Sequence, residues 1–194
     1  MYKDLFFPTS VYVKDIGSPE LNENLKKDIL FLSKRDPGIK KSNDNGWHSR
    51  NDIYNMSEYK ELSSLLFKMQ NKIYEEEGLE PSPVIGNMWA NINPKGGFNK
   101  THMHSNSLWS GVYYVKTPSN CGNLGIKDPR AISLMTLPKY NKKLKPSQWR
   151  EIYYEAVAGR CIMFPSWLEH YVEPNQSDDI RISISFNFLQ KRFA

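Results

Sequence analysis

The sequence predicts a mainly β fold with helical support, and two observations lead to this prediction. The first 80 residues carry apolar side chains at helical spacing, whereas from Pro83 onward short β-rich segments are separated by glycine, proline or asparagine. Helices followed by runs of short strands are typical of an antiparallel sheet braced by helices, or of a barrel or jelly roll with a helical support. The 194 residues suffice for one domain with its own core.

Two helices are predicted in the first part of the chain. The first begins at Ser18, a common N-cap residue, and Pro19 follows at the first helical position, where its missing N–H costs nothing. Its apolar residues recur at helical spacing, at Leu21, Leu25, Ile29 and Leu32. The second begins near Ser57 and Glu58 and stops at Gly78. Its apolar face comprises Leu62, Leu65, Leu66, Met69 and Ile73.

The segments between and after these helices divide into loops and strands. Residues 40–52, KKSNDNGWHSRND, are rich in turn formers and predict a loop. The predicted strands are VIGNMWANI, SGVYYV, EIYYEAVA, CIMF and RISISFNF. Between two of them, residues 137–148 carry four lysines and two prolines, which predicts a long surface insertion.

Charge and cysteine content exclude few functions. The net charge of +5 is spread along the chain, so nucleic acid is a possible partner but not a favoured one. The two cysteines, Cys121 and Cys161, have no metal or redox spacing, which favours a reducing, cytoplasmic setting. No apolar run approaches membrane-spanning length and none forms a signal sequence, so we expect a soluble protein without membrane contact.

Three of the four histidines lie beside predicted strands. His102 and His104 precede SGVYYV, and His170 follows CIMF. Residues at i and i+2 of a strand end face the same side, so His102 and His104 can reach one metal ion, with His170 coming from a distant strand. Three such ligands leave coordination positions open for substrate and O2, and imidazole suits iron, zinc and copper alike. An isolated HxH pair is, however, as often two surface histidines in a loop.

An arginine makes the metal interpretation stronger. Arg181 follows His170 by eleven residues, and Ser183 shares its strand face by the period of two. A guanidinium fork binds a carboxylate through two parallel hydrogen bonds. The alternative is an exposed strand arginine that pairs with Asp178 or Asp179.

The combination of the histidine pair before SGVYYV, then GRCIMFPSWLEH, then RISISFN, resembles the Fe(II)/2-oxoglutarate-dependent oxygenases. This family includes uncharacterised bacterial and phage proteins and is distantly similar to prolyl hydroxylases. The resemblance implies a double-stranded β-helix (jelly roll, cupin-like) core over residues 84–190, with an N-terminal strand and supporting helices in residues 1–80. Together they would form a single oxygenase domain, residues 1–194.

The resemblance also implies an activity and a set of site residues. The enzyme would hydroxylate an unidentified substrate with release of succinate and CO2, using Fe(II) and the co-substrate 2-oxoglutarate, and with no catalytic residue beyond the metal ligands. His102 and His170 would be ligands, and Arg181 and Ser183 would anchor 2-oxoglutarate. His104 stands where the family has an acid. We expect His104 to be the third ligand, because imidazole is a better ligand than the alternatives, the carboxamide of Asn106 or a water.

Other residues near the motifs are weaker candidates for the site. Tyr114 could donate its phenol to the far carboxylate of 2-oxoglutarate. Asn91 shares a strand face with Trp89, and a buried asparagine requires the hydrogen-bond partners that a ligand would supply. Ordinary core packing is the alternative for all three. Trp109 and Trp167 flank the histidines and are expected to wall the pocket, whereas His48 is expected in a surface loop, with the substrate entrance as the alternative location.

Two other functions compete with the oxygenase. A cupin-like metalloenzyme with three histidines and no use of 2-oxoglutarate explains the HxH pair but assigns no role to Arg181 and Ser183. A binding module with a degenerate site could use the lysine-rich segment 139–145 to recognise protein or nucleic acid. The primary substrate, protein, peptide or small metabolite, and the oligomeric state cannot be read from the sequence. Because the family has phage members, a phage protein that acts in the host cytoplasm is a further possibility.

Overall fold

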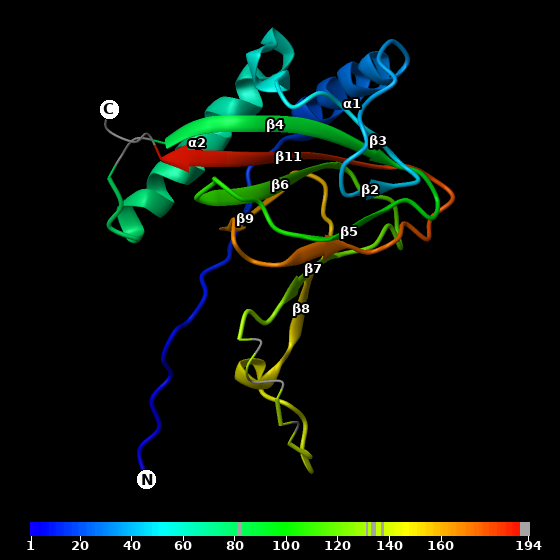
Figure 1. Ribbon diagram of the computed structural model, residues 1–194. Coiled ribbons are helices and arrows are strands. Elements are labelled where there is room, and N and C mark those ends of the chain that lie inside the picture. Colours follow the sequence, from blue (N-terminus) through cyan, green and yellow to red (C-terminus); the bar gives the residue numbers. More distant parts are fainter. Residues whose placement is uncertain (81–82, 131, 133–134, 137, 191–194) are drawn as a thin grey trace.

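A computed structural model describes residues 1–80, 83–130, 132, 135–136 and 138–190. Two antiparallel sheets pack on each other, and two helices cover the outer face of the larger sheet (Figure 1). The six-stranded sheet has the order β1 (Tyr12–Asp15), β9 (Arg160–Pro165), β6 (Trp109–Lys116), β11 (Arg181–Gln190), β4 (Pro83–Asn93) and β3 (Trp47–His48). The five-stranded sheet has the order β2 (Asn43–Asp44), β5 (Phe98–His102), β10 (His170–Val172), β7 (Leu124–Lys127) and β8 (Glu151–Tyr154). The predicted mainly β fold with helical support is confirmed.

Both predicted helices are present. Helix α1 (Pro19–Ser33) begins where Ser18 Oγ accepts a hydrogen bond from the Leu21 amide at 3.1 Å. Helix α2 (Lys60–Glu76) follows two 3-10 turns, η1 (Ile53–Asn55) and η2 (Ser57–Tyr59). The chain leaves α2 through Gly78, whose φ of 66° is costly for any residue with a Cβ. A further 3-10 turn, η4, spans Pro146–Gln148.

The alternating sequence of β11 divides its side chains between two environments. Its apolar residues enter the core under the helices and are fully buried: Ile182, Ile184, Phe186 and Phe188. Each such side chain contributes about 1.5–3 kcal/mol through removal of its surface from water. Its polar residues, at the alternate positions, face the second sheet: Arg181, Ser183, Ser185 and Asn187. The period of two thus places one polar row inside the β sandwich.

The second sheet contains most of what the sequence did not predict. Strands β5, β7 and β10 are short and mix polar with apolar residues, so they lack the alternation that marked the longer strands. The expected loop at residues 40–52 contributes β2 and β3, which pair with β5 and β4. Its turn-forming composition gave no strand signal, because these two-residue strands are held only by their neighbours.

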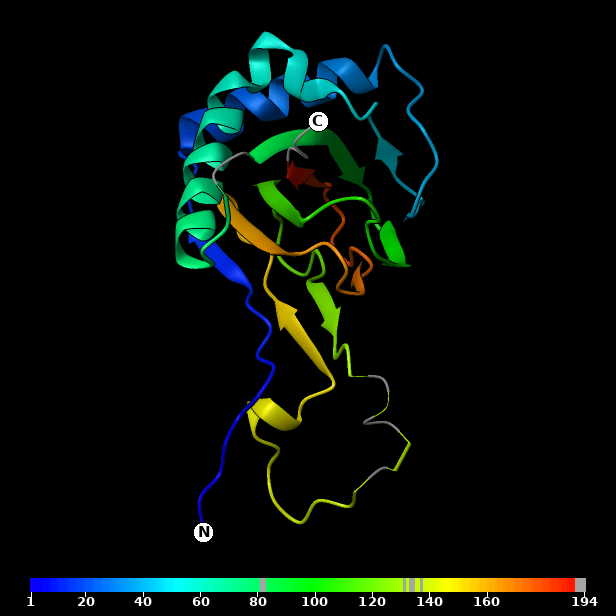
Figure 2. The same ribbon diagram turned by 60° about the vertical axis from the view of Figure 1, so that its left-hand side comes forward.

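Two segments extend away from the sheets (Figure 2). One is the N-terminal segment that precedes β1, and the other is made up of the described residues between β7 and β8. Within the second segment, residues 138–147 are exposed throughout, as the predicted surface insertion requires, while Leu137 lies outside the described residues. Among the residues that the structure describes, no helix is long and apolar enough to cross a membrane.

Candidate active site

His102, His104 and His170 form one cluster inside the sandwich. His102 ends β5 and is the direct cross-strand partner of His170, which begins β10. The ring centroids of these two residues are 4.3 Å apart, and His104 lies 5.0 and 5.1 Å from them. One nitrogen atom of each ring lies within 4.8 Å of the other two. The three side chains can therefore reach a common metal ion.

The same ring nitrogen is engaged in all three histidines. Nδ1 of His102 lies 2.6 Å from the Lys100 carbonyl oxygen, and Nδ1 of His170 lies 2.8 Å from the Leu168 carbonyl oxygen. Nδ1 of His104 lies 2.6 Å from Asn187 Oδ1. Carbonyl oxygens only accept hydrogen bonds, so each Nδ1 carries the proton and donates it. The lone pair of each Nε2 is then available to a metal.

Burial keeps these imidazoles in the form that binds metals. Desolvation and, to a lesser extent, the neighbouring His102 lower the pKa of His170 to about 3. Desolvation also lowers the pKa of His104 to about 4 and brings the pKa of His102 below its ordinary value. At neutral pH all three rings are uncharged. A metal ion at this position therefore does not have to displace protons from its ligands.

A cavity opens beside the three histidines and runs between the two sheets. Its lining includes polar side chains from β4, β6 and β11 together with apolar residues from β7, β9 and β10. Four residues singled out from the sequence line it, namely Trp89, Asn91, Tyr114 and Ser183. Trp89 and Asn91 share one face of β4, as predicted. Ser183 is the direct cross-strand neighbour of both Asn91 and Tyr114.

Arg181 is fully buried behind this lining. Its Nη1 donates hydrogen bonds to the backbone oxygens of Cys121 and Glu173, whereas its Nη2 has no partner among the described residues. Burial raises the pKa of the Tyr114 phenol, and the nearby positive charge of Arg181 offsets part of this rise. A buried guanidinium N–H without an acceptor is costly, so the arrangement favours an anion at this end of the cavity.

The predicted alternative for Arg181, an exposed arginine paired with an aspartate, is wrong. Asp178 pairs with Lys95 at 2.6 Å, and Asp179 pairs with Lys116 at 2.7 Å. Both carboxylates lie on the surface, where ion pairs contribute little to stability.

Two more polar atoms in the lining lack hydrogen-bond partners among the described residues. The Tyr114 hydroxyl is buried and has none. Asn91 donates from Nδ2 to Ser185 Oγ at 3.3 Å, while its Oδ1 has none. Rotation of this carboxamide by half a turn would place its NH2 toward the cavity and its oxygen toward the Ser185 hydroxyl, which can donate. Both groups could then donate to a ligand carboxylate.

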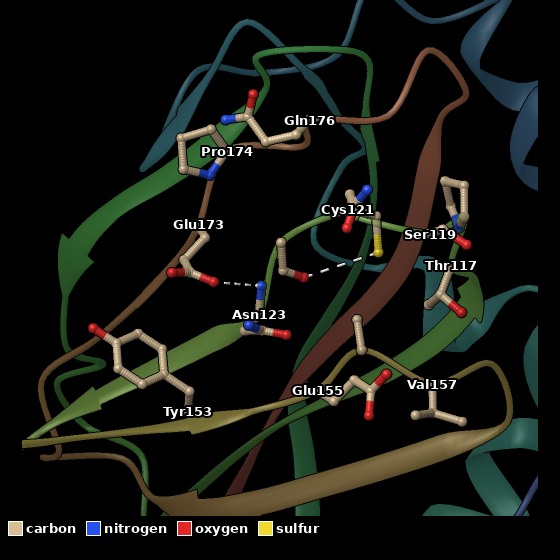
Figure 3. Close-up of a pocket in the computed structure, with 14 residues that line it drawn as sticks. Thr117, Ser119, Cys121, Asn123, Tyr153, Glu155, Val157, Glu173, Pro174 and Gln176 are labelled. Carbon is tan, nitrogen blue, oxygen red and sulfur yellow. Dashed lines mark hydrogen bonds between the residues drawn. The ribbon is translucent and has the colours of Figure 1, made fainter.

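A larger cavity, of about 900 Å³, lies outside this site (Figure 3). Cys121 and Glu173, whose backbone oxygens accept hydrogen bonds from Arg181, also line this cavity. Its charged lining residues are Glu155 and Glu173. Figure 3 shows Glu173 turned toward the Asn123 amide, from which it accepts a hydrogen bond at 3.0 Å. The lining of this cavity contains no imidazole, so size alone does not locate the chemistry.

Several expectations about neighbouring residues are wrong. His48 is buried in β3 and stacks on Trp89 at 5.4 Å, because pairing with β4 draws the expected loop into the sheet. Trp109 packs against Tyr12 in the core under the helices, and Trp167 is 55% exposed, so neither walls the cavity. Asn106, the alternative ligand, is exposed in a turn with φ of 61°.

Several polar residues of the site were not predicted from the sequence, among them Asn187, Ser110 and Ser185. Asn187 accepts the hydrogen bond of a histidine in the cluster, and Ser110 and Ser185 line the cavity. The signal was available in RISISFNF, since the period that pairs Arg181 with Ser183 continues to Ser185 and Asn187.

The residues present fit iron and 2-oxoglutarate. Three neutral imidazoles that face one point suit a transition metal, and they leave coordination positions for further ligands. The unpartnered donors, Arg181 Nη2 and the Tyr114 hydroxyl, suit a carboxylate.

Comparison with solved structures shows the same fold. A Pseudomonas putida prolyl-4-hydroxylase is 15% identical, with 95% of this chain and 94% of that chain covered and a TM-score of 0.69. HygX from Streptomyces hygroscopicus, solved with nickel, 2-oxoglutarate and hygromycin B, is 11% identical, with 95% and 84% covered and a TM-score of 0.67. A Trichoplax adhaerens prolyl hydroxylase, solved with a hypoxia inducible factor peptide, is 14% identical, with 93% and 83% covered and a TM-score of 0.64. The expected jelly-roll core is thereby confirmed.

The sequence itself identifies the family. Among curated proteins, none matches this sequence. The model of the family described as "Putative 2OG-Fe(II) oxygenase" matches residues 87–187, which is more than half of the chain. The matched segment contains the three clustered histidines and Arg181. The chain therefore belongs to the 2OG-Fe(II) oxygenase family and is an oxidoreductase that uses Fe(II) and 2-oxoglutarate.

Proposed function

We propose that His102, His104 and His170 hold the Fe(II) of this oxygenase. The observation that carries the proposal is the convergence of their ring nitrogens within 4.8 Å, with each Nδ1 engaged elsewhere. When bound there with 2-oxoglutarate and O2, iron supplies the oxidation that forms succinate and CO2 and hydroxylates the primary substrate. The protein presents three fixed neutral nitrogens, and it needs no further acid or base of its own.

We further propose that Arg181 binds the carboxylate of 2-oxoglutarate that lies farther from the iron. Its Nη1 is already held by two backbone oxygens, so the guanidinium is fixed while Nη2 remains available. Such preorganisation lowers the entropy lost on binding. Tyr114 and Ser183 face each other across β6 and β11 and contribute hydroxyl donors, and Asn91 contributes its NH2.

The ligand set changes the charge of the site. With three neutral imidazole ligands the site keeps the full charge of the metal ion, whereas with two imidazoles and one carboxylate the net charge of the site is one unit lower. In a buried site, an additional positive charge attracts a dianion more strongly than it would in water. We therefore propose that His104, in the position that the family fills with an acid, strengthens the binding of 2-oxoglutarate.

The primary substrate is proposed to be a protein, a peptide or a small metabolite, rather than nucleic acid. Related structures were solved with a peptide and with hygromycin B, which supports both size classes. We also propose a single domain, residues 1–194, that works in a reducing, cytoplasmic setting. Cys121 and Cys161 are both buried and free, which supports a reducing setting.

Turnover of 2-oxoglutarate tests the proposal. Purified protein with Fe(II) and ascorbate should convert 2-oxoglutarate to succinate, and His170→Ala should abolish this conversion. Tyr113→Phe is the matched control, since Tyr113 hydrogen-bonds Asn22 of α1 on the opposite face of the sheet. Metal uptake without any succinate would instead support the cupin-like alternative, and equal turnover by His170→Ala would contradict the ligand assignment.

A further inference from the structure

Asn187 lies at the centre of a buried polar network that joins the two sheets. It is 4% exposed, and its direct cross-strand partners are Asn87 on β4 and Ser110 on β6. All three side chains therefore project from adjacent positions on the inner face of the larger sheet. His104, in the segment after β5, reaches this network from the second sheet.

Every polar atom of the Asn187 carboxamide is engaged. Its Oδ1 accepts hydrogen bonds from His104 Nδ1 and from Ser110 Oγ, both at 2.6 Å. Its Nδ2 donates to Asn87 Oδ1, also at 2.6 Å. The Ser110 hydroxyl shares a second hydrogen bond with Ser166 Oγ at 2.8 Å, and the Ser166 carbonyl oxygen accepts from the His104 amide at 2.9 Å. The network thus holds both the ring and the backbone of His104.

His104 differs from the other two histidines in the chemistry of its partner. His102 and His170 donate to backbone carbonyl oxygens, which can only accept. The partner of His104 is a carboxamide, which accepts through oxygen in one orientation and donates through NH2 in the other. If the carboxamide were reversed, Nδ1 of His104 would have to accept, and its proton would move to Nε2, leaving no lone pair for a metal.

We propose that Asn187 is a positioning residue that fixes His104 in the tautomer able to bind the metal. Asn87 Oδ1 accepts from Nδ2, and the Ser110 hydroxyl is hydrogen-bonded to Oδ1, so reversal of the Asn187 carboxamide would require the Asn87 carboxamide to reverse and the Ser110 hydroxyl to reorient with it. This proposal rests on the proposed role of His104 as a ligand. It adds that ligation by His104 depends on hydrogen bonds from three strands of the larger sheet.

Cobalt(II) binding to the purified 194-residue protein tests this role without turnover. Asn187→Leu keeps the side-chain volume but removes the acceptor, and it should weaken Co(II) binding about 10- to 100-fold, the usual loss when a ligand's hydrogen-bond partner is removed. It should also shift the visible absorption bands of bound Co(II), because the donor strength of His104 changes. Asn187→Asp keeps an acceptor for Nδ1 and should retain the affinity. Ser110→Ala, a milder change, should fall between the wild-type protein and Asn187→Leu.

The matched control is Asn175→Ala. Asn175 is fully buried, and the three hydrogen bonds of its side chain go to backbone groups of Asn93, Ser177 and Asp179. This variant should lower the melting temperature without changing the affinity for Co(II) or the absorption bands. Unchanged affinity and unchanged bands in folded Asn187→Leu would overturn the proposal, as would equal losses in Asn187→Asp and Asn187→Leu.

His104→Ala separates this proposal from the function on which it rests. If His104→Ala loses affinity for Co(II) and Asn187→Leu does not, His104 is a ligand and Asn187 does not position it. If His104→Ala binds Co(II) as the wild-type protein does, the ligand assignment itself fails and the role of Asn187 fails with it.

Discussion

His102 and His170 are direct partners in the antiparallel pairing of β5 and β10, with ring centroids 4.3 Å apart. Opposed side chains in such a pair have Cβ atoms about 4.5–5.5 Å apart, so strand pairing alone brings these two imidazoles to one point. Ile126 on β7 pairs with His170 from the other side. The two histidines are therefore fixed by the sheet itself, whereas the ring of His104, beyond the end of β5, is held by a side-chain hydrogen bond to Asn187.

Removal of one of the paired histidines should abolish tight metal binding. His170→Ala leaves two ligands, and we expect the metal content of the purified protein to fall from one ion per chain to near zero. His48→Phe is the control, because His48 stacks on Trp89 and is not part of the three-histidine cluster. Elemental analysis after dialysis measures the content. Retention of one ion per chain by His170→Ala would show that the metal is bound elsewhere.

Arg181→Ala should weaken 2-oxoglutarate binding and leave metal binding largely intact. Hydrogen bonds to charged groups contribute about 1.5–3 kcal/mol each, so we expect a loss of about 10- to 100-fold in affinity or more. Calorimetric titration of 2-oxoglutarate into the Mn(II)-loaded protein measures it. Arg160→Ala, which removes an arginine paired with Asp15 near the surface, is the control. Equal loss of metal and 2-oxoglutarate binding would mean that Arg181 is structural.

Adjacent tyrosines on β6 allow a matched comparison. Tyr114 faces the cavity with an unpartnered hydroxyl, whereas Tyr113 faces α1 and donates to Asn22. Tyr114→Phe should lower the affinity for 2-oxoglutarate by about 1.5–3 kcal/mol, because the hydroxyl would donate to a charged carboxylate. Tyr113→Phe should lower the melting temperature and leave that affinity unchanged. The same titration checks both variants. A loss of affinity in Tyr113→Phe but not in Tyr114→Phe would place the carboxylate of 2-oxoglutarate elsewhere.

Replacement of His104 by an acid tests the charge argument. His104→Asp restores the acid that the family pattern expects, so metal binding should persist. The site would lose one unit of positive charge, and the affinity for 2-oxoglutarate should fall. Titrations of 2-oxoglutarate measure this fall in affinity. The fall should be nearly the same at two salt concentrations, because buried charges are poorly screened by salt. An increase in affinity would contradict the proposed benefit of a third imidazole.

The buried histidines make the metal-free protein sensitive to acid. Burial lowers the pKa of His170 to about 3 and of His104 to about 4, against an ordinary value of 6.5. Below pH 6.5 the unfolded chain therefore binds more protons than the folded one, and stability falls as the pH decreases toward these lowered values. Each histidine that stays neutral costs at most about 1.4 kcal/mol per pH unit. Urea unfolding at pH 7 and pH 5 should show the loss, and a variant with His170 replaced by phenylalanine should show a smaller one.

The sequence predicted what depends on local pattern. The N-cap and apolar spacing of α1, the apolar face of α2 with its stop at Gly78, and the long alternating strands such as β11 were confirmed, and the period of two placed Ser183 in the cavity lining. The predicted start of the second helix at Ser57 and Glu58 lies in the 3-10 turn η2, and α2 itself begins at Lys60 without a side-chain cap. The division into residues 1–80 and 84–190 stays a prediction, although β1, β2 and β3 of the first part pair with strands of the second.

The parts that could not be predicted depend on contacts between distant segments. His48 was expected at the surface because nothing in GWHSRND indicates that β4 pairs with it. Trp109 lies on the helical face of β6, which the strand pattern alone could not distinguish from the cavity face. The partner of His104, at Asn187, is 83 residues away and lies in β11 of the larger sheet, whereas His104 lies in the segment after β5.

The most direct test is a crystal structure of the protein with Mn(II) and 2-oxoglutarate, in which anomalous scattering locates the metal. We predict one peak bonded to Nε2 of His102, His104 and His170, with a carboxylate of 2-oxoglutarate at Arg181. A peak bonded to other residues, or 2-oxoglutarate bound away from Arg181, would contradict this prediction.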